Sequence, residues 1–196
     1  MLCGSIGYSK WFKRLIFRKI NEYFRVQALK PSDVSSRYST NEGKKAFVFF
    51  DHCNDELGDS VDDKLIPGMI NGNPSIELLL AGRDIDAGMS PNENLLRLIT
   101  KSRKTIVIFS SNFCDTPTCK FVLQALQELQ HSAGRDQPIL VEWHGEEAAR
   151  VPELIQRTFN RKFYNFLRFD QTNDDEVMFF EILRTAFASS STALDD

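Results

Sequence analysis

The spacing of hydrophobic and polar positions changes repeatedly along this chain. Five short runs are apolar almost throughout: "KAFVFF", "SIELLL", "KTIVIFS", "QPILVEW" and "YNFLRF". Unbroken apolar runs of this length are typical of strands that are covered on both faces, as in a parallel sheet. Segments with helical spacing lie between them. The alternation predicts repeated βα units around a single sheet.

Helix starts are marked by capping residues. In "SPNE", residues 90–93, the serine can cap, the proline suits the first helical position and the glutamate completes a capping box, so a helix is expected from residue 91. Similar starts lie at 115–117 and 174–176. A helix between the first two strands is expected to end at Pro67-Gly68. Five strands and about five helices predict a doubly wound α/β domain of the flavodoxin-like kind, with helices on both faces of five parallel strands.

The amino-terminal segment has a different character. Apolar residues recur at helical spacing from residue 10 to residue 29, with basic residues between them, which predicts a basic amphipathic helix. A serine-rich stretch without periodicity follows. We therefore expect a basic amphipathic arm, a linker, an α/β domain and a disordered tail, at residues 1–29, 30–43, 44–188 and 189–196.

The arm combines aromatic and basic side chains in a way that favours contact with an anionic membrane surface. The alternative is an extra helix packed on the domain. The residues expected to touch a membrane are Trp11, Phe12, Lys13, Arg14, Phe17, Arg18 and Lys19.

The composition of the chain excludes several classes of protein. The first 30 residues hold seven basic side chains and one acid, while the remainder holds 17 basic and 26 acidic ones, so the domain itself is not expected to bind nucleic acid. Four cysteines without a CxxC pair predict neither a disulfide framework nor a metal site. No apolar run reaches the ~18 residues of a membrane span. These features predict a cytoplasmic protein, with the arm at the inner face of a membrane if it binds one.

Known cofactor motifs are missing. The first strand runs into "DHCNDELG" rather than GxGxxG, and GxxxxGK[ST] occurs nowhere, so no nucleotide cofactor is expected. The hypothesis of a phospho-receiver domain rests on fold analogy alone. Such a domain needs an aspartate after the third strand and a lysine after the fifth, but these strands run into "SSNF" and "DQTN".

One loop stands out instead. After the second strand comes "GRDIDAG", bracketed by two glycines, at the carboxyl edge of the predicted sheet, where functional loops are often held. Arginine and aspartate side chains can make charge-assisted contacts, the glycines permit tight turning, and an isoleucine and a methionine can form an apolar tip. The alternative hypothesis is that Arg83 and Asp84 form an ion pair with each other and only shape the loop. The candidate partner-binding residues are Gly82, Arg83, Asp84, Ile85, Asp86, Ala87, Gly88 and Met89.

Three segments in order resemble boxes 1, 2 and 3 of the Toll/interleukin-1 receptor (TIR) domain: "KKAFVFF", "GRDIDAGMSPNENLLRLITKSRKTIVIFSSNF" and "MFFEILRTAF". The resemblance implies a cytoplasmic signalling module, either an adaptor or the intracellular part of a receptor, in innate immunity. It implies that the loop from Gly82 to Ser90, the BB loop of the family, mediates homo- or hetero-oligomeric assembly with other TIR domains. Phe179 and Phe180 of the third box are expected in the core.

The chain departs from the family pattern at two places. Ala87 stands where the family often has proline, which removes a backbone constraint from the loop. Enzymatic TIR domains that cleave NAD carry a glutamate in a pattern like Trp-Cys-x-x-Glu, and the corresponding residues here are Thr118, Cys119 and, in place of the glutamate, Val122. We therefore expect no enzymatic activity and no catalytic residue. The alternative is a TIR-type NAD hydrolase with atypical catalytic residues.

Overall fold

A computed structural model describes most of the α/β domain. The described residues are 45–50, 59, 61–71, 76–109, 116–144, 152–159, 166–170 and 176–189. The predicted arm with its membrane-contact residues and the linker lie outside these ranges, as does the tail after residue 189. Those predictions and the domain boundaries therefore stay predictions. Among the described residues, no helix is long and apolar enough to span a membrane.

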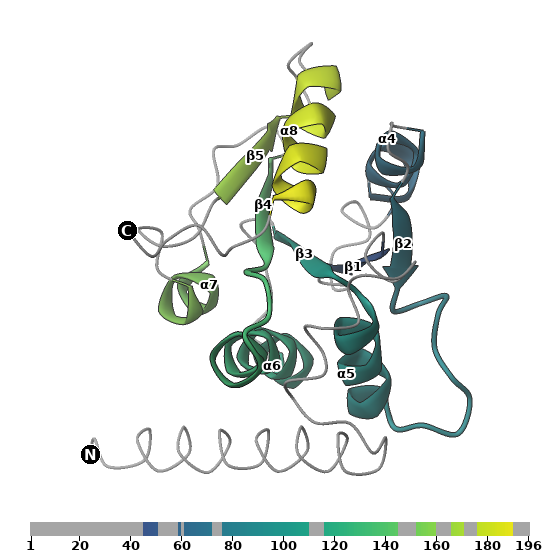
Figure 1. The fold of residues 1–196 in the computed structure, drawn as a ribbon, viewed down its shortest axis with the longest axis vertical. Coiled ribbons are helices and arrows are strands. Elements are labelled where there is room, and N and C mark those ends of the chain that lie inside the picture. Colours follow the sequence, from purple (N-terminus) through teal and green to yellow (C-terminus); the bar gives the residue numbers. More distant parts are fainter. Residues whose placement is uncertain are drawn as a thin grey trace.

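Five parallel strands form one sheet (Figure 1). Their order confirms the flavodoxin-like prediction, because the chain first moves to one edge and then crosses back over its first strand. Each of the five apolar runs identified in the sequence contains a strand. In sheet order these are β2 (Glu77–Leu80), β1 (Lys45–Phe50), β3 (Lys104–Phe109), β4 (Ile139–His144) and β5 (Phe166–Asp170).

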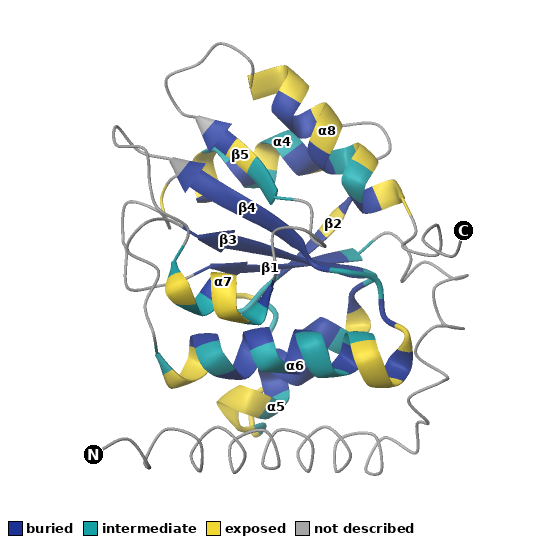
Figure 2. Cartoon of the chain, turned by 90° about the vertical axis from the view of Figure 1, so that its left-hand side faces the viewer, coloured by how far each residue is buried: buried dark blue, intermediate teal, exposed yellow. Residues whose placement is uncertain are grey.

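Helices cover both faces of the sheet, as predicted (Figure 2). One face carries α5 (Pro91–Lys101), α6 (Pro117–Ala133) and α7 (Glu153–Thr158). The other carries a π-helical segment, η3 (Val61–Leu65), with α4 (Ile66–Ile70) and α8 (Glu176–Ala188).

The sheet separates two hydrophobic cores. Successive side chains of a strand point to opposite faces, so in β1 Phe47 and Phe49 enter the core under α5 and α6, while Ala46 and Val48 enter the core under α4 and α8. Both sets are buried. The strands are therefore apolar at nearly every position rather than at alternate ones.

Two of the three predicted helix starts, those of α5 and α6, are confirmed. Ser90 Oγ accepts a hydrogen bond from the Glu93 N–H at 3.4 Å, and the Glu93 carboxylate accepts one from the Ser90 N–H at 2.9 Å, which completes the capping box of α5. Thr116 caps α6 by accepting from the Cys119 N–H at 3.2 Å. The described part of α8 runs from Glu176, and the residues just before it lie outside the described ranges, so the start expected at 174–176 stays a prediction.

The predicted helix end at Pro67-Gly68 is wrong, because α4 continues through both residues to Ile70. Pro67 lies in the first turn of α4, where a missing N–H costs little. The Gly68 backbone packs against the Phe180 ring, and its carbonyl accepts a 2.7 Å hydrogen bond from Arg184 of α8. Tertiary contact with α8 therefore outweighs the local tendency of Pro-Gly to end a helix.

The aromatic residues of the third box are core residues, as expected. Phe179 and Phe180 are buried, and their ring centroids lie 4.8 Å and 6.3 Å from that of Phe169 on β5. Trp143 of β4 stacks on the Phe169 ring, with 4.1 Å between the ring centroids. This aromatic cluster fastens α8 to the β4–β5 side of the sheet.

Two cations at the start of β3 hold the carboxyl end of α8. Lys104 Nζ donates to the Ala186 carbonyl at 2.6 Å and also to that of Ser189, while Arg103 donates to the Ala188 carbonyl at 2.8 Å. Positive charge at a helix carboxyl terminus is favourable. Burial lowers the pKa of the Lys104 ammonium, and the nearby Asp136 carboxylate acts in the opposite direction.

Candidate functional site

The loop singled out in the sequence leaves the carboxyl end of β2 and leads into α5. Because β2 is an edge strand, the loop stands at the side of the sheet, away from its centre (Figure 1). Residues Gly82 to Met89 are called the 82–89 loop below. Most of its residues are exposed, and only Asp84 and Met89 are half-buried.

Arg83 and Asp84 fasten the base of the loop to the strand that precedes it. The Asp84 carboxylate accepts a 2.8 Å hydrogen bond from the Leu80 N–H, and the Arg83 guanidinium donates to the Leu78 carbonyl. The two side chains also form an ion pair, with 3.0 Å between Arg83 Nη2 and Asp84 Oδ2. Backbone N–H groups of both residues donate to the Leu80 carbonyl, at 3.1 Å and 2.8 Å, and close a tight turn.

These contacts give Arg83 and Asp84 a role within the chain. Unpaired N–H and C=O groups on an edge strand invite pairing with another chain, and these two side chains cover one of each on β2. The local pairing considered from the sequence is therefore present. Contact between either side chain and a partner stays a prediction.

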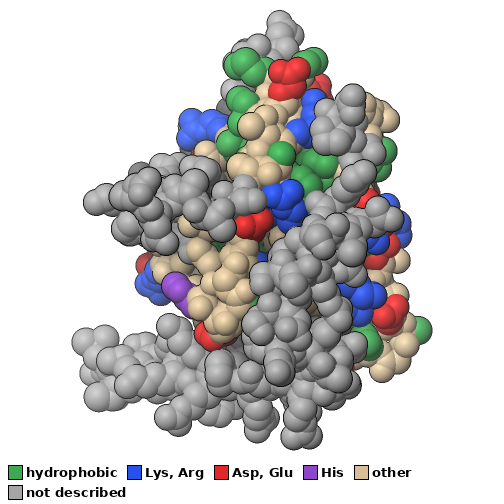
Figure 3. All heavy atoms as spheres, in the orientation of Figure 1, with side chains coloured by type: hydrophobic (Ala, Val, Ile, Leu, Met, Phe, Trp, Pro, Cys, Tyr) green, Lys and Arg blue, Asp and Glu red, His purple; other side chains and the backbone are tan. Residues whose placement is uncertain are grey.

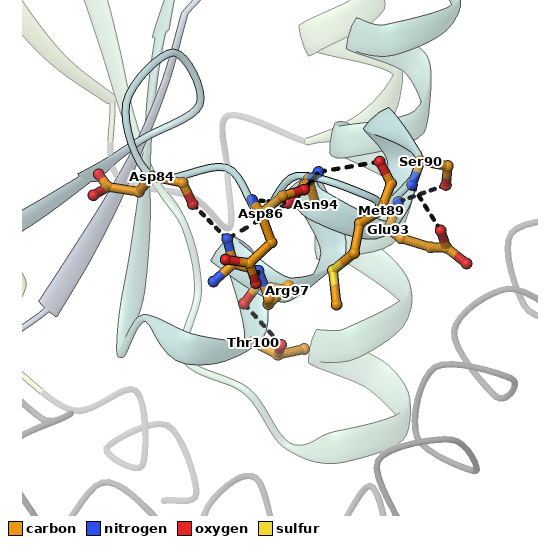
Figure 4. Close-up of polar contacts among 8 residues, drawn as sticks. All are labelled: Asp84, Asp86, Met89, Ser90, Glu93, Asn94, Arg97 and Thr100. Atoms are coloured by element: carbon orange, nitrogen blue, oxygen red, sulfur yellow. Dashed lines mark hydrogen bonds and ion pairs between the residues drawn. The ribbon is translucent and has the colours of Figure 1, made fainter.

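Asn94, at the start of α5, binds the backbone of the middle of the loop through its side-chain amide. Its Oδ1 accepts from the Asp86 N–H at 2.8 Å, and its Nδ2 donates to the Asp86 carbonyl at 3.1 Å and to the Met89 carbonyl at 3.4 Å (Figure 4). The amide thereby pairs with both backbone groups of Asp86, as a neighbouring strand would. Asn94 is only 6% exposed, so these hydrogen bonds also satisfy a buried polar side chain.

Arg97 lies one helical turn further along α5 and binds the loop at two points. Its Nη2 donates to the Asp84 carbonyl, and its Nε lies 3.0 Å from Asp86 Oδ2 in an ion pair (Figure 4). The same Nη2 lies 3.5 Å from Asn94 Oδ1. Asn94 and Arg97 therefore form one polar network beneath the loop.

Sequence reasoning missed both of these residues. It considered only the loop residues themselves and the capped start of the helix that follows them. A signal was nevertheless present, because Asn94 and Arg97 are three residues apart and so share a helix face. The positions around them are buried and apolar: Leu95, Leu96, Leu98 and Ile99. Polar residues within such a face need partners, and here the loop supplies them.

The tip of the loop is largely uncharged. Ile85 is 56% exposed, Ala87 and Gly88 are exposed, and Met89 is half-buried. Gly88 has φ = 94°, a conformation that side-chain-bearing residues rarely adopt. The constraint lost by having alanine at residue 87 is offset by anchors on either side of it, at Asp86 and at the Ser90 cap.

The positions that correspond to the catalytic pattern offer no carboxylate. Val122 is fully buried in the core between α6 and the sheet, Cys119 is buried beside it, and Thr118 is exposed. Over the part of the chain that the structure describes, no cluster of histidine, cysteine and acidic side chains could hold a metal ion. On the face seen in Figure 3, basic and acidic side chains of described residues are interspersed.

The sheet order and the fastened loop at its edge define a flavodoxin-like α/β domain without a nucleotide-binding glycine motif. Residues 47–164 match the family model of the TIR domain. The chain therefore belongs to the TIR domain family, as the resemblance of its three boxes indicated.

Individual relatives agree with this assignment. Toll-like receptor 2 of Mus musculus is 27% identical over 132 residues, which are 66% of this chain and 17% of that protein. Protein toll of Drosophila melanogaster is 26% identical over 96 residues, which are 49% of this chain and 8% of that protein. The chain thus spans less than a fifth of these curated relatives.

Solved structures share the fold. The TIR domain of the Toll-related receptor TRR-2 from Hydra magnipapillata has a TM-score of 0.52 and 19% identity, and the match covers 74% of this chain and 98% of that one. A TIR-STING receptor from C. gigas, solved in complex with 2',3'-cGAMP, has a TM-score of 0.50 and 14% identity over 74% of this chain and 39% of that one.

Proposed function

We propose that this chain is a TIR signalling module that assembles with other TIR domains through the 82–89 loop. One observation supports this most strongly: the loop is exposed at its tip and fastened at its base and middle by the strand before it and the helix after it. A surface that is already ordered loses less conformational entropy on binding. A loop with no role would need no such network of buried polar groups.

The loop offers a partner an apolar contact surrounded by polar groups. Ile85 lies between Asp84 and Asp86, and the carboxylates of both neighbours are held by arginines of the same chain. An exposed apolar side chain with fixed neighbours is a typical anchor of a protein interface. We propose other TIR domains as the partners, either copies of this chain or a different family member.

Replacing Ile85 with serine tests this proposal. The change removes the apolar anchor and leaves the base and middle of the loop intact, so we expect TIR–TIR association to weaken roughly tenfold or more without loss of folding. Sedimentation velocity of the whole chain, alone and mixed with the TIR domain of mouse Toll-like receptor 2, measures the effect.

Ile70→Ser is the matched control, because Ile70 is also an exposed isoleucine but lies on α4, across the sheet from α5. Equal weakening by both substitutions would contradict a specific role for the loop. A folded Ile85→Ser variant that associates like the unchanged protein would contradict it as well.

We further propose that the chain does not hydrolyse NAD. The side chain at the position of the family's catalytic glutamate is a buried valine, which can neither accept a proton nor stabilise a developing positive charge on a ribose. Incubation of the concentrated, assembled protein with NAD is expected to release no nicotinamide above a protein-free control. Release in proportion to protein concentration would instead favour an NAD hydrolase with atypical catalytic residues.

The family of the chain and its matched relatives are the basis for proposing where it acts. The matched proteins include Toll-like receptors, so we place the chain in innate immune signalling and propose that it acts in the cytoplasm as an adaptor or as the intracellular part of a receptor.

A further inference from the structure

The guanidinium of Arg97 is a charged group buried among apolar side chains, and its burial needs an explanation. Arg97 is 7% exposed and lies on α5 beside Leu96 and Leu98, at a position where leucine or methionine would pack without a desolvation cost. Burying a charge is unfavourable unless it is paired, and an apolar residue of similar size often stabilises such a site equally well. Stability alone therefore does not explain an arginine here.

The contacts of Arg97 point toward the loop. Its Nη2 donates to the Asp84 carbonyl and its Nε pairs with the Asp86 carboxylate at 3.0 Å. These two loop residues flank Ile85, so a single side chain fixes both neighbours of the exposed apolar residue. A guanidinium spreads its charge over several N–H groups, so it can donate to a carbonyl while it pairs with a carboxylate.

The two ends of the ion pair differ in exposure. The Arg97 side chain is 9% exposed and that of Asp86 is 54% exposed. The pair therefore links the rigid helix to a residue that lies at the surface. Because Asp86 is held on one side by Arg97 and on its backbone by Asn94, its position is set before any partner arrives.

We infer that Arg97 is a positioning residue, which holds the 82–89 loop in the conformation that docks on a second TIR domain. The consequence for docking rests on the proposed function, whereas the ordering of the loop does not. In this arrangement the acidic groups beside Ile85 are neutralised within the chain, so the loop presents an apolar contact to its partner.

Hydrogen exchange of the whole chain tests the ordering step. The N–H of Asp86 donates to Asn94 and that of Met89 donates to the Asp86 carbonyl, so both amides report directly on the loop. In Arg97→Met we expect both amides to exchange about tenfold faster, while amides of β1 and β3 exchange as before once a change in global stability is subtracted.

Arg135→Met is the matched control. Arg135 is also a buried arginine, but it donates to Ser102 Oγ and to the Ser102 carbonyl, at 2.9 Å and 2.7 Å. Ser102 caps the carboxyl end of α5, whereas the loop leads into the amino end. Its replacement is expected to leave loop exchange unchanged at matched global stability. If Arg97→Met does not fold, Asp86→Asn removes the same ion pair from the exposed side and is expected to accelerate exchange at Met89 severalfold.

Association measured on the same variants tests the docking step. Arg97→Met is expected to weaken association about tenfold and Arg135→Met less than twofold, in line with the exchange effects. Unchanged loop exchange in Arg97→Met overturns the inference, and so does accelerated exchange with unchanged association. If the unchanged protein does not associate with any TIR domain, the proposed function fails, and the exchange result alone decides whether Arg97 orders the loop.

Discussion

Replacing Gly68 with alanine is expected to lower the free energy of unfolding by about 2 kcal/mol, within the range measured for overpacked cores. A Cβ at this position would lie 2.4 Å from Phe180 Cζ and 2.5 Å from both Cε atoms, which is closer than carbon atoms can approach. The ring cannot move aside freely, because Phe180 is 5% exposed and packs against Phe169 and Phe179. Either α4 or α8 must therefore shift.

Urea denaturation followed by circular dichroism measures this effect. Gly82→Ala serves as the control, since no atom lies within 4 Å of a Cβ built there. Shortening the ring in the Gly68→Ala, Phe180→Leu double variant should recover part of the loss, so the two substitutions should not be additive. A Gly68→Ala variant as stable as the unchanged protein would show that α4 does not rest on the Phe180 ring.

Replacing Gly88 with alanine is expected to weaken TIR–TIR association about tenfold while the domain remains folded. A Cβ at Gly88 would meet no atom within 4 Å, so steric clash plays no part. The backbone at φ = 94° is instead unfavourable for alanine by roughly 1–2 kcal/mol, and the loop would relieve this strain by leaving its present conformation. The cost therefore falls on the 82–89 loop, the proposed docking surface.

Gly82→Ala is also the control for this effect. Both glycines belong to the same loop, both are exposed, and both have open space where a Cβ would be. Of these two glycines, only Gly88 has a positive φ in the range that side-chain-bearing residues rarely adopt. We expect Gly82→Ala to change association by less than about twofold. A difference between the two variants can then be assigned to backbone conformation.

Much of the fold could be predicted because its signals are local. The strands are unbroken apolar runs such as 45–50, since both faces of the sheet are covered, and the α5 start is encoded in four consecutive residues, 90–93. The one wrong helix end, at Pro67-Gly68, came from judging a local breaker without its tertiary partner. The contact with Phe180 joins residues more than a hundred positions apart, and no local pattern reveals it.

The loop could be located from the sequence, but its internal support could not. Glycines and charges mark residues 82–89 as a loop of interest. The Asp84 carboxylate reaches the Leu80 N–H because the chain turns tightly after β2. Arg97 reaches Asp86 because α5 packs beside the loop. The sequence predicts that Arg83 and Asp84 contact a partner, with local pairing as the alternative. The structure shows the local pairing at the edge of β2, and the partner contact stays a prediction.

The most direct test of the central claim is sedimentation velocity of the whole chain over a range of concentrations, with the unchanged protein, Gly88→Ala and Gly82→Ala compared side by side. Parallel runs with added TIR domain of mouse Toll-like receptor 2 cover the case of a different partner. If the chain assembles through the 82–89 loop, the unchanged protein and Gly82→Ala associate in a concentration-dependent way, and Gly88→Ala associates about tenfold more weakly. Equal association of all three folded proteins would contradict assembly through the 82–89 loop.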